Sequence, residues 1–147
     1  MKITNPRVFH DFNILETLEA GINLTGREVK SIRSSRMSLD GSFVKIVGSE
    51  IYLINAQIFL YPYARPEGYD AKRTRKLLLH KKEIISLKSK LASARLTIVP
   101  LECYNSHGVF KLKIGIASGK REYEKREKLK RRDIDREVQR ELKVKIN

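Results

Sequence analysis

The stretch from Glu19 to Arg33 holds the residues whose types and spacing best suggest a chemical role. It reads EAGINLTGREVKSIR, with a turn predicted at residues 20–21, then a short apolar strand and a second turn at Gly26. An amphipathic helix is predicted to begin there, and Lys30 and Arg33, three residues apart, project from one of its flanks. A basic flank beside a glycine turn can grip a phosphate backbone, although a solvated helix face would show the same spacing.

Two further groups of residues could take part in the same chemistry. Residues 64–76 (ARPEGYDAKRTRK) are predicted to form a loop that ends in four basic residues, Lys72, Arg73, Arg75 and Lys76. Three tyrosines near this loop could stack on bases or pack at a barrel edge: Tyr61, Tyr63 and Tyr69. Lys111 and Lys113 alternate with apolar residues, which is typical of a half-buried strand. They could form a phosphate-binding surface, or serve solubility and edge protection.

Residue patterns typical of catalysis are missing from the sequence. The histidines are far apart and show neither the HExxH motif nor paired cysteines for zinc: His10, His80 and His107. The run GIASGK at residues 115–120 resembles a phosphate-binding loop only superficially. Its first glycine falls in a predicted strand, and Arg121 follows in place of Ser or Thr. We therefore expect no enzymatic activity, no metal and no cofactor.

The charge of the 147-residue chain indicates a polyanionic partner. Lys and Arg number 31 against 17 Asp and Glu, which gives a net charge of +14 and a pI near 10.0. Nucleic acid is favoured over a membrane, because no apolar run approaches the roughly 20 residues that a span requires. No signal-peptide pattern follows Lys2, and the single cysteine, Cys103, is expected to be a buried thiol. These features predict a cytoplasmic protein.

The hydrophobic pattern predicts several short strands with helices between them. Residues 1–11 are expected to be irregular, and helices are predicted from Gly26 and over residues 80–94. Strands are predicted over residues 12–18, 43–47, 51–54, 96–104 and 110–116. This succession favours a mainly β protein, namely a small antiparallel OB-like β-barrel with two or three helices and a basic C-terminal tail.

A composition change near Gly119 divides the chain into a predicted barrel, residues 1–118, and a tail, residues 119–147. The tail has 12 Lys and Arg against 7 Asp and Glu, and three of its aliphatic residues form one thin stripe at helical spacing: Ile134, Val138 and Leu142. Three aliphatic residues cannot hold so long a helix in water. The tail is therefore predicted to be disordered alone and helical against a partner.

Taken in order, several blocks of the sequence resemble the tmRNA-binding small protein B (SmpB) family of bacteria, also called SsrA-binding protein. The blocks are EAGI at residues 19–22, GREVKSIR at 26–33, TRKLLLHKKEI at 74–84, PLECY at 100–104, KLKIGIASGKR at 111–121 and EKR at 124–126. Each block alone is weak, but their joint order and spacing are highly specific, and they extend over nearly the whole chain.

The resemblance implies a non-enzymatic adaptor of trans-translation, the rescue of ribosomes stalled on messages that lack a stop codon. Members of the family have an OB-like barrel that binds the tRNA-like domain of tmRNA. They reach the empty A site with alanyl-tmRNA and elongation factor Tu. Their tail then lies as a helix in the vacant mRNA channel, at the decoding centre of small-subunit ribosomal RNA. The nascent peptide is tagged for degradation.

Carried over residue by residue, the resemblance implies two sets of contact residues. The tmRNA surface would include Asn5, Arg7, His10, Glu19, Lys30, Arg33, Leu78 and Lys111. The predicted RNA-binding surface is completed by Gly21, Arg73, Arg75, Lys76 and Lys113. The ribosome-binding tail would include Gly119, Lys120, Arg121, Tyr123, Glu124, Lys125 and Arg126. Glu19 would repel phosphate, so it fits only if it accepts hydrogen bonds from base or ribose donors, or orients a neighbouring lysine.

Two other classes of protein remain open from composition alone. A structural ribosomal protein is also small, basic and tailed, and would thread its tail through ribosomal RNA. A nuclease that uses Glu19 or His10 would require divalent cations, for which the sequence offers no ligand cluster.

Overall fold

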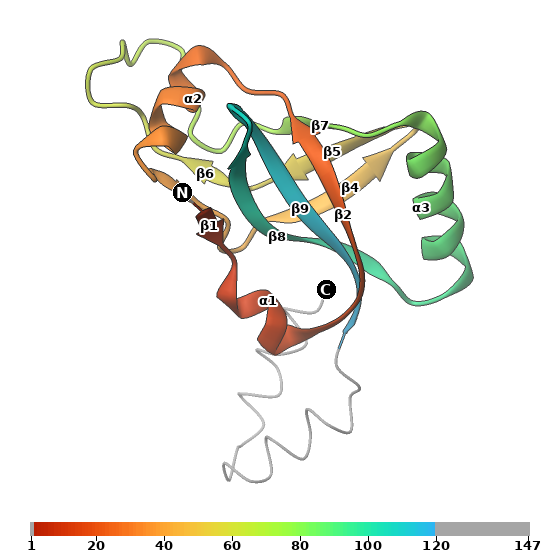
Figure 1. The fold of residues 1–147 in the computed structure, drawn as a ribbon. Helices are drawn as coiled ribbons and strands as arrows, with labels where there is room; N and C mark the ends of the chain where they lie inside the picture. Colours follow the sequence, from red (N-terminus) through yellow and green to blue (C-terminus); the bar gives the residue numbers. More distant parts are fainter. Residues whose placement is uncertain (1, 120–147) are drawn as a thin grey trace, which may run out of the picture.

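The computed structural model describes residues 2–119, which form a β-barrel with three helices (Figure 1). The predicted tail from residue 120 onward, with all of its expected contacts except Gly119, lies outside the described residues. The elements are β1 (Lys2–Thr4), α1 (Pro6–Asp11), β2 (Phe12–Ile22), α2 (Gly26–Arg33), β3 (Met37–Ser38), β4 (Phe43–Val47), β5 (Glu50–Ile54), β6 (Gln57–Ile58), β7 (Arg75–Leu78), α3 (Lys81–Ser93), β8 (Thr97–Ser106) and β9 (Val109–Gly119).

Six antiparallel strands close into a ring. The sheet runs in the order β1-β8-β4-β5-β7-β2-β9, and β9 pairs with β8 as well as with β2. The ring is therefore β8-β4-β5-β7-β2-β9, with β1 added along the outer edge of β8. Closure leaves few unpaired strand edges, which suits a small barrel. The prediction of a mainly β, antiparallel barrel is confirmed.

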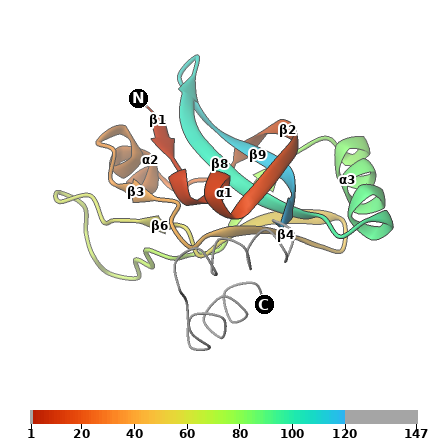
Figure 2. The same ribbon diagram turned by 90° about the horizontal axis from the view of Figure 1, so that it is seen from below.

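Inward-pointing aliphatic side chains from every strand of the ring fill the barrel. Leu53, Leu77 and Leu112 are among those with almost no exposed surface. The helices α2 and α3 lie at opposite ends of the molecule (Figures 1 and 2). Each contributes buried residues to this same core, Ile32 from α2 and Leu87 from α3. Burial of their apolar faces is what holds these short helices in place.

A second, smaller core lies between α1 and the outside of the barrel. Val8 of α1 packs with Val99, Leu101 and Ala117 on β8 and β9. Pro6 suits the first turn of α1, because the missing N–H has no helical partner there. The prediction that residues 1–11 are irregular is therefore wrong: α1 is held by three buried apolar residues that come from distant parts of the sequence.

The sequence-predicted elements are otherwise found close to their expected bounds, with one instructive exception. The helices over residues 26–33 and 81–93 and the hairpin of β4 and β5 are present. The turn predicted at Ala20–Gly21 is wrong, because β2 runs without a break from Phe12 to Ile22. Among residues 2–119, none of the helices combines the length and the hydrophobicity that a membrane span requires.

Candidate nucleic-acid interface

The pairing register places one row of side chains on the outside of five adjacent strands. Gly21 of β2 lies opposite Leu78 on one side and Lys111 on the other. Lys111 lies opposite Tyr104 of β8, which in turn lies opposite Lys2 of β1. Their chain neighbours point into the barrel, so these residues point outward. We call Leu78, Gly21, Lys111, Tyr104 and Lys2 the outer row.

A second row, two residues further along the strands, carries both signs of charge. Glu19, Lys113 and Glu102 lie opposite one another on β2, β9 and β8. A carboxylate oxygen of Glu102 lies 3.4 Å from Nζ of Lys113, and the other oxygen lies 3.7 Å from Nζ of Lys2. Among residues 2–119, Lys111 has no such ion pair. Its charge is therefore the one in this patch that no carboxylate neutralises.

Tyr104 connects the two rows. Its hydroxyl group donates a hydrogen bond to Oε2 of Glu19 across the intervening strand β9. Burial, together with this bond to the carboxylate, raises the pKa of Tyr104 from its ordinary 10.0 to about 12, so the hydroxyl remains a donor well above neutral pH. The carboxylate of Glu19 is thereby fixed beside the lysines while remaining on the exposed surface.

Gly21 allows a close approach of Leu78 at this point of the sheet. A Cβ atom added to it would lie 3.1 Å from the Cβ of Leu78 and 3.4 Å from its Cδ1. Because Gly21 has no side chain, the side chain of Leu78 can pack closely against strand β2. Leu78 is still 54% exposed, so it offers an apolar surface next to Lys111. The sequence signal at Gly21 is real, but it marks a close approach and not a turn.

The first turn of α2 is built around a buried carboxylate, Glu28. It accepts a hydrogen bond from the backbone N–H of Thr25 at 2.9 Å, while the Thr25 hydroxyl accepts one from the N–H of Glu28 at 3.3 Å. This capping box satisfies donors that the helix start leaves without partners. Glu28 also binds Arg73 at 2.7 Å and Arg75 at 2.6 Å. The carboxylate thus ties α2 to the end of the basic loop.

Arg75, which was predicted to lie on the RNA-binding surface, is buried instead. Its side chain is fully buried and donates hydrogen bonds to Glu28 and to the carbonyl oxygens of Ala56 and Ala71. A guanidinium group so enclosed cannot reach a phosphate. Arg73 is partly exposed, but it too donates to Glu28, and it also donates to the carbonyl oxygen of Asn23. Both arginines bind Glu28, but Arg73 keeps part of its side chain on the surface while Arg75 does not. The sequence run KRTRK did not reveal these contacts.

The loop that follows β6 is held against α2 by several contacts. Arg27 donates to the carbonyl oxygens of Arg65 and Glu67 and lies over the ring of Tyr69, 5.1 Å from its centroid. The hydroxyl group of Tyr69 donates to the carbonyl oxygen of Ile58 at 2.6 Å. Tyr69 therefore serves packing in this structure. Tyr61 and Tyr63 meet edge to face, and Tyr63 is 88% exposed.

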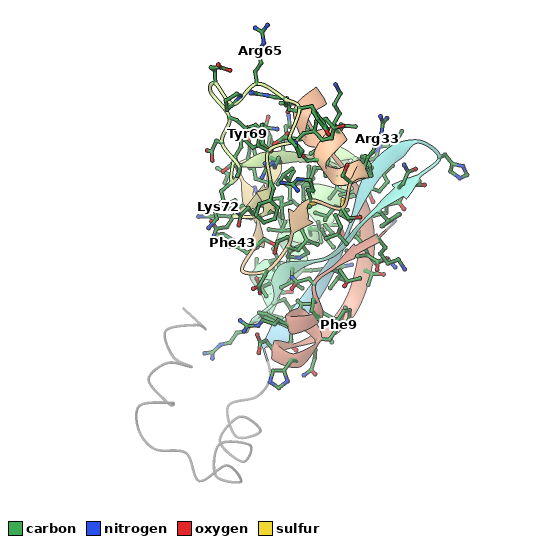
Figure 3. All side chains as sticks on the ribbon, turned by 90° about the vertical axis from the view of Figure 1, so that its left-hand side faces the viewer. Phe9, Arg33, Phe43, Arg65, Tyr69 and Lys72 are labelled. Atoms are coloured by element: carbon green, nitrogen blue, oxygen red, sulfur yellow. The ribbon has the colours of Figure 1, made fainter. Side chains whose placement is uncertain are left out.

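The basic flank of α2 is exposed as its spacing predicted. Lys30 and Arg33 both lie on the surface, and Arg33 projects outward on the side of the molecule where the β8–β9 hairpin rises (Figure 3). Lys76 of β7 is exposed but lies 3.3 Å from a carboxylate oxygen of Glu50. The predicted basic residues are therefore divided between free surface charges and charges with partners.

The predicted N-terminal contacts also differ in their surroundings. Asn5 is buried, and its side-chain amide donates to the carbonyl oxygen of Pro100 at 3.0 Å. Arg7 and His10 are exposed on α1, where Arg7 lies 4.0 Å from a carboxylate oxygen of Asp40. Phe9 of the same helix is 59% exposed and lies near the lower end of the barrel (Figure 3). Asn5 therefore anchors α1 to β8, while the others face outward.

The described residues offer neither a metal-binding cluster nor a reactive cysteine. Residues 2–119 contain no group of three or more His, Cys, Asp or Glu side chains placed to hold a metal ion. Cys103 is buried as predicted, and burial raises the pKa of its thiol to about 12. Such a thiol is protonated at neutral pH and behaves as a small apolar residue.

Sequence reasoning missed Tyr104 and Glu102, which complete the charged patch. Both belong to the block PLECY, but only the pairing of β8 with β9 shows that they face Lys111 and Lys113. An irregularity in that pairing, between Pro100 and Glu102, sets this register. The only sequence signal was the alternation of polar and apolar residues over positions 101–104.

The protein is a small, closed β-barrel. One outer face carries a lysine without a carboxylate partner among the described residues, an oriented carboxylate and an exposed apolar residue. Such a face is suited to contact with a polyanion. Comparison with known proteins places the protein more narrowly. A family model described as "SmpB protein" matches residues 2–144. The chain belongs to the SmpB family.

The sequences of two similar proteins align with this chain over at least 90% of their own length. The SsrA-binding protein of Ligilactobacillus salivarius is 50% identical over 139 residues, which cover 95% of this chain and 90% of that protein. The SsrA-binding protein of a Sulfurihydrogenibium species is 50% identical over 143 residues, with 97% and 94% covered. A chain from the solved structure described as "tmRNA-SmpB: a journey to the center of the bacterial ribosome" is 43% identical. The two structures superpose with a TM-score of 0.67, and the match covers 82% of this chain and 85% of that chain.

Proposed function

We propose that this protein is the tmRNA-binding adaptor of trans-translation. In this role the barrel binds the tRNA-like domain of tmRNA and delivers alanyl-tmRNA, with elongation factor Tu, to stalled ribosomes in the cytoplasm. The nascent peptide is then tagged for degradation. Membership of the SmpB family, relatives named SsrA-binding protein and a similar chain solved with tmRNA support this proposal. The protein acts by binding and has no catalytic step of its own.

The observation that carries the proposal is the composition of the outer face at β2, β7 and β9. Lys111 offers a positive charge with no carboxylate partner among the described residues, which suits a phosphate group. Leu78 offers exposed apolar surface, which suits the face of an unstacked base. Glu19 accepts hydrogen bonds only, so it suits a base amino group or a ribose hydroxyl and rejects phosphate.

The exposed flank of α2 offers further positive charges for phosphate groups. Lys30 and Arg33 are exposed and belong to a helix whose start is fixed by Glu28. A rigid helix places two charges at a set spacing, which positions a folded RNA without reading its sequence. The buried Arg75 and the partly exposed Arg73 support the flank through Glu28, and Lys30 and Arg33 make the proposed contact.

The basic tail completes the proposed function. Residues 120–147 follow the end of β9, and we propose that they lie in the empty mRNA channel and contact small-subunit ribosomal RNA. Gly119, Lys120 and Arg121 are proposed to join the barrel to the tail. The residues proposed to reach the decoding centre are Tyr123, Glu124, Lys125 and Arg126. A segment rich in Lys and Arg can replace the charge contacts that a messenger RNA would otherwise make.

Direct binding tests the proposal. The full chain is titrated against the tRNA-like domain of tmRNA and, separately, against a ribosomal RNA hairpin of equal length at the same salt concentration. The expected result is a preference of at least about tenfold for the tRNA-like domain, which corresponds to about 1.4 kcal/mol. Equal affinity for both RNAs would show only general attraction to polyanions, and the proposed function would fail.

A further inference from the structure

The geometry points to Tyr104 as a positioning residue for RNA binding, which holds the carboxylate of Glu19 in the orientation that RNA recognises. This inference rests on the proposed function and adds a residue that the sequence did not single out. It follows from the place of Tyr104 in the outer row, from its hydrogen bond and from the distribution of charge around it.

The position of Tyr104 lets its side chain cross one strand. Tyr104 on β8 lies opposite Lys111 on β9, and Glu19 on β2 lies opposite Lys113 on β9. The hydroxyl group therefore reaches diagonally over β9, between the two lysines, to Oε2 of Glu19. A glutamate side chain on a strand surface has several rotamers, and this bond selects one of them.

The charge distribution explains why a neutral hydroxyl group, and not a lysine, orients Glu19. Lys113 lies opposite Glu19 but makes its ion pair with Glu102, whose other oxygen lies near Lys2. Lys111 is left without a carboxylate among the described residues. If Glu19 turned toward Lys111, the two charges would neutralise each other and neither would be offered to RNA. A tyrosine hydroxyl fixes Glu19 without using either lysine.

The same bond determines what Glu19 can accept. With Oε2 bound to Tyr104, the other oxygen, Oε1, is left as a further hydrogen-bond acceptor on an exposed residue. It suits an RNA donor such as a base amino or imino group or a 2′-hydroxyl. Lys111 stands beside it for a phosphate oxygen. The pair would then distinguish RNA donors from phosphate at adjacent positions.

A double-mutant cycle tests this inference. Tyr104→Phe removes only the hydroxyl group, Glu19→Gln removes the charge, and both are combined in a third variant. Affinity for the tRNA-like domain of tmRNA is expected to fall about 10- to 100-fold in Tyr104→Phe, on the scale of a hydrogen bond to a charged group. The double variant should bind no more weakly than Glu19→Gln alone, because the hydroxyl acts through the carboxylate.

The chain offers a matched control for the loss of a tyrosine hydroxyl. Tyr52 on β5 also donates a hydrogen bond to a carboxylate, that of Glu50. Tyr52→Phe therefore removes the same kind of bond, while the ion pair of Glu50 with Lys76 at 3.3 Å still holds that carboxylate. Its RNA affinity should stay within about twofold of the wild type, since a surface substitution that leaves the charges in place has little effect. Thermal unfolding of each variant shows whether the fold is intact.

A second variant keeps the test decisive if Tyr104→Phe does not fold. Glu19→Asp keeps the charge on an exposed residue but shortens the side chain, so its carboxylate should no longer meet Tyr104, and its affinity should fall as in Glu19→Gln. Full affinity in Tyr104→Phe or Glu19→Asp, or strictly additive losses in the cycle, would overturn the positioning role. Failure of the wild type itself to prefer the tRNA-like domain would instead overturn the proposed function.

Discussion

Glu28 joins three parts of the protein through a single buried carboxylate. It caps α2, binds the partly exposed Arg73 and neutralises Arg75, whose side chain is fully buried. Burial acts to raise the pKa of Glu28, but hydrogen bonds from Arg73, the Thr25 amide and Arg75 outweigh it and hold the pKa below its ordinary value of 4.5. The carboxylate is therefore more favourable ionised in the folded protein than in the unfolded chain.

Replacing Glu28 by Gln tests this arrangement. Glutamine can still accept the Thr25 N–H bond, so the capping box survives while the charge that balances Arg75 is lost. We expect the free energy of unfolding to fall by about 3 kcal/mol, as when one partner of a buried ion pair is removed. Urea unfolding measures this loss.

The third helix supplies the control for that variant. Glu83 holds the same capping position in α3, where it accepts the backbone N–H of His80 at 3.0 Å, and it has no ion pair among the described residues. Glu83→Gln should therefore change the free energy of unfolding by less than about 0.5 kcal/mol. Equal losses in the two variants would mean that Glu28 acts only as a cap.

The lowered pKa of Glu28 also sets a pH dependence. Because the pKa is lower in the folded state, the stability that Glu28 contributes is fully present above its unfolded value of 4.5 and is lost as the pH falls below it. The free energy of unfolding of the wild type should therefore decrease more steeply below about pH 5 than that of Glu28→Gln. Parallel pH profiles for the two proteins would contradict this account.

At the scale of elements, α2 is an exposed basic surface on a buried support. Its inner face contributes Ile32 to the barrel core, and its first turn is tied to the loop by Glu28 and Arg27. Lys30 and Arg33 remain on the outside. A helix fixed at this many points can hold two charges at a constant spacing, which matters for a rigid RNA more than for a flexible one.

Removal of these two charges should weaken RNA binding uniformly. In Lys30→Ala/Arg33→Ala, affinity for the tRNA-like domain should fall, and the slope of log affinity against log salt should become shallower by about one to two units if each residue contacts one phosphate. Lys81→Ala/Lys82→Ala on α3, at the opposite end of the barrel, removes the same charge and serves as the control. Equal effects in both double variants would remove the α2 flank from the site.

The elements whose patterns are local could be predicted from the sequence. The amphipathic helices and the β4–β5 hairpin depend on spacing and turn residues within a short window, and they are present. The helix α1 and the unbroken course of β2 depend on partners more than 60 residues away, such as Leu101 beneath α1 and Lys111 opposite Gly21. No local pattern contains those partners, so the sequence suggested an irregular start and a turn.

The same distinction holds for the candidate site. The exposed charges Lys30, Arg33 and Lys111 follow from residue type and alternation, which are visible in the sequence. The buried role of Arg75 and the contact of Tyr104 with Glu19 follow from strand pairing and from burial. A run of basic residues shows its total charge, but only the three-dimensional structure shows which charges have partners.

At the scale of the whole molecule, basic charge is spread over barrel and tail. Residues 1–118 carry a net charge of +9 and residues 119–147 a net charge of +5. We propose that the two parts bind different RNAs, the barrel tmRNA and the tail the ribosome. Residue Gly119 ends β9 opposite Phe12, so the tail starts at the end of the barrel near α1 (Figure 1).

Truncation after Gly119 should separate the two proposed activities. The residues of the described core all lie within residues 2–119, so the shortened chain should keep its affinity for the tRNA-like domain within about threefold, on the scale expected for a modest loss of nonspecific attraction. Peptide tagging on stalled ribosomes should be abolished, because the tail no longer reaches the mRNA channel. Tagging that survives the truncation would contradict the role of the tail.

The central claim, that tmRNA is the partner, is tested most directly by the RNA that the protein carries. The protein is purified from its own cells at moderate salt, and the RNA that remains bound is sequenced. The account predicts one dominant RNA with a tRNA-like end, and loss of that RNA in Lys111→Ala. A spread of ribosomal RNA fragments, with the protein kept at one copy per subunit after a high-salt wash, would identify a ribosomal component and contradict the account.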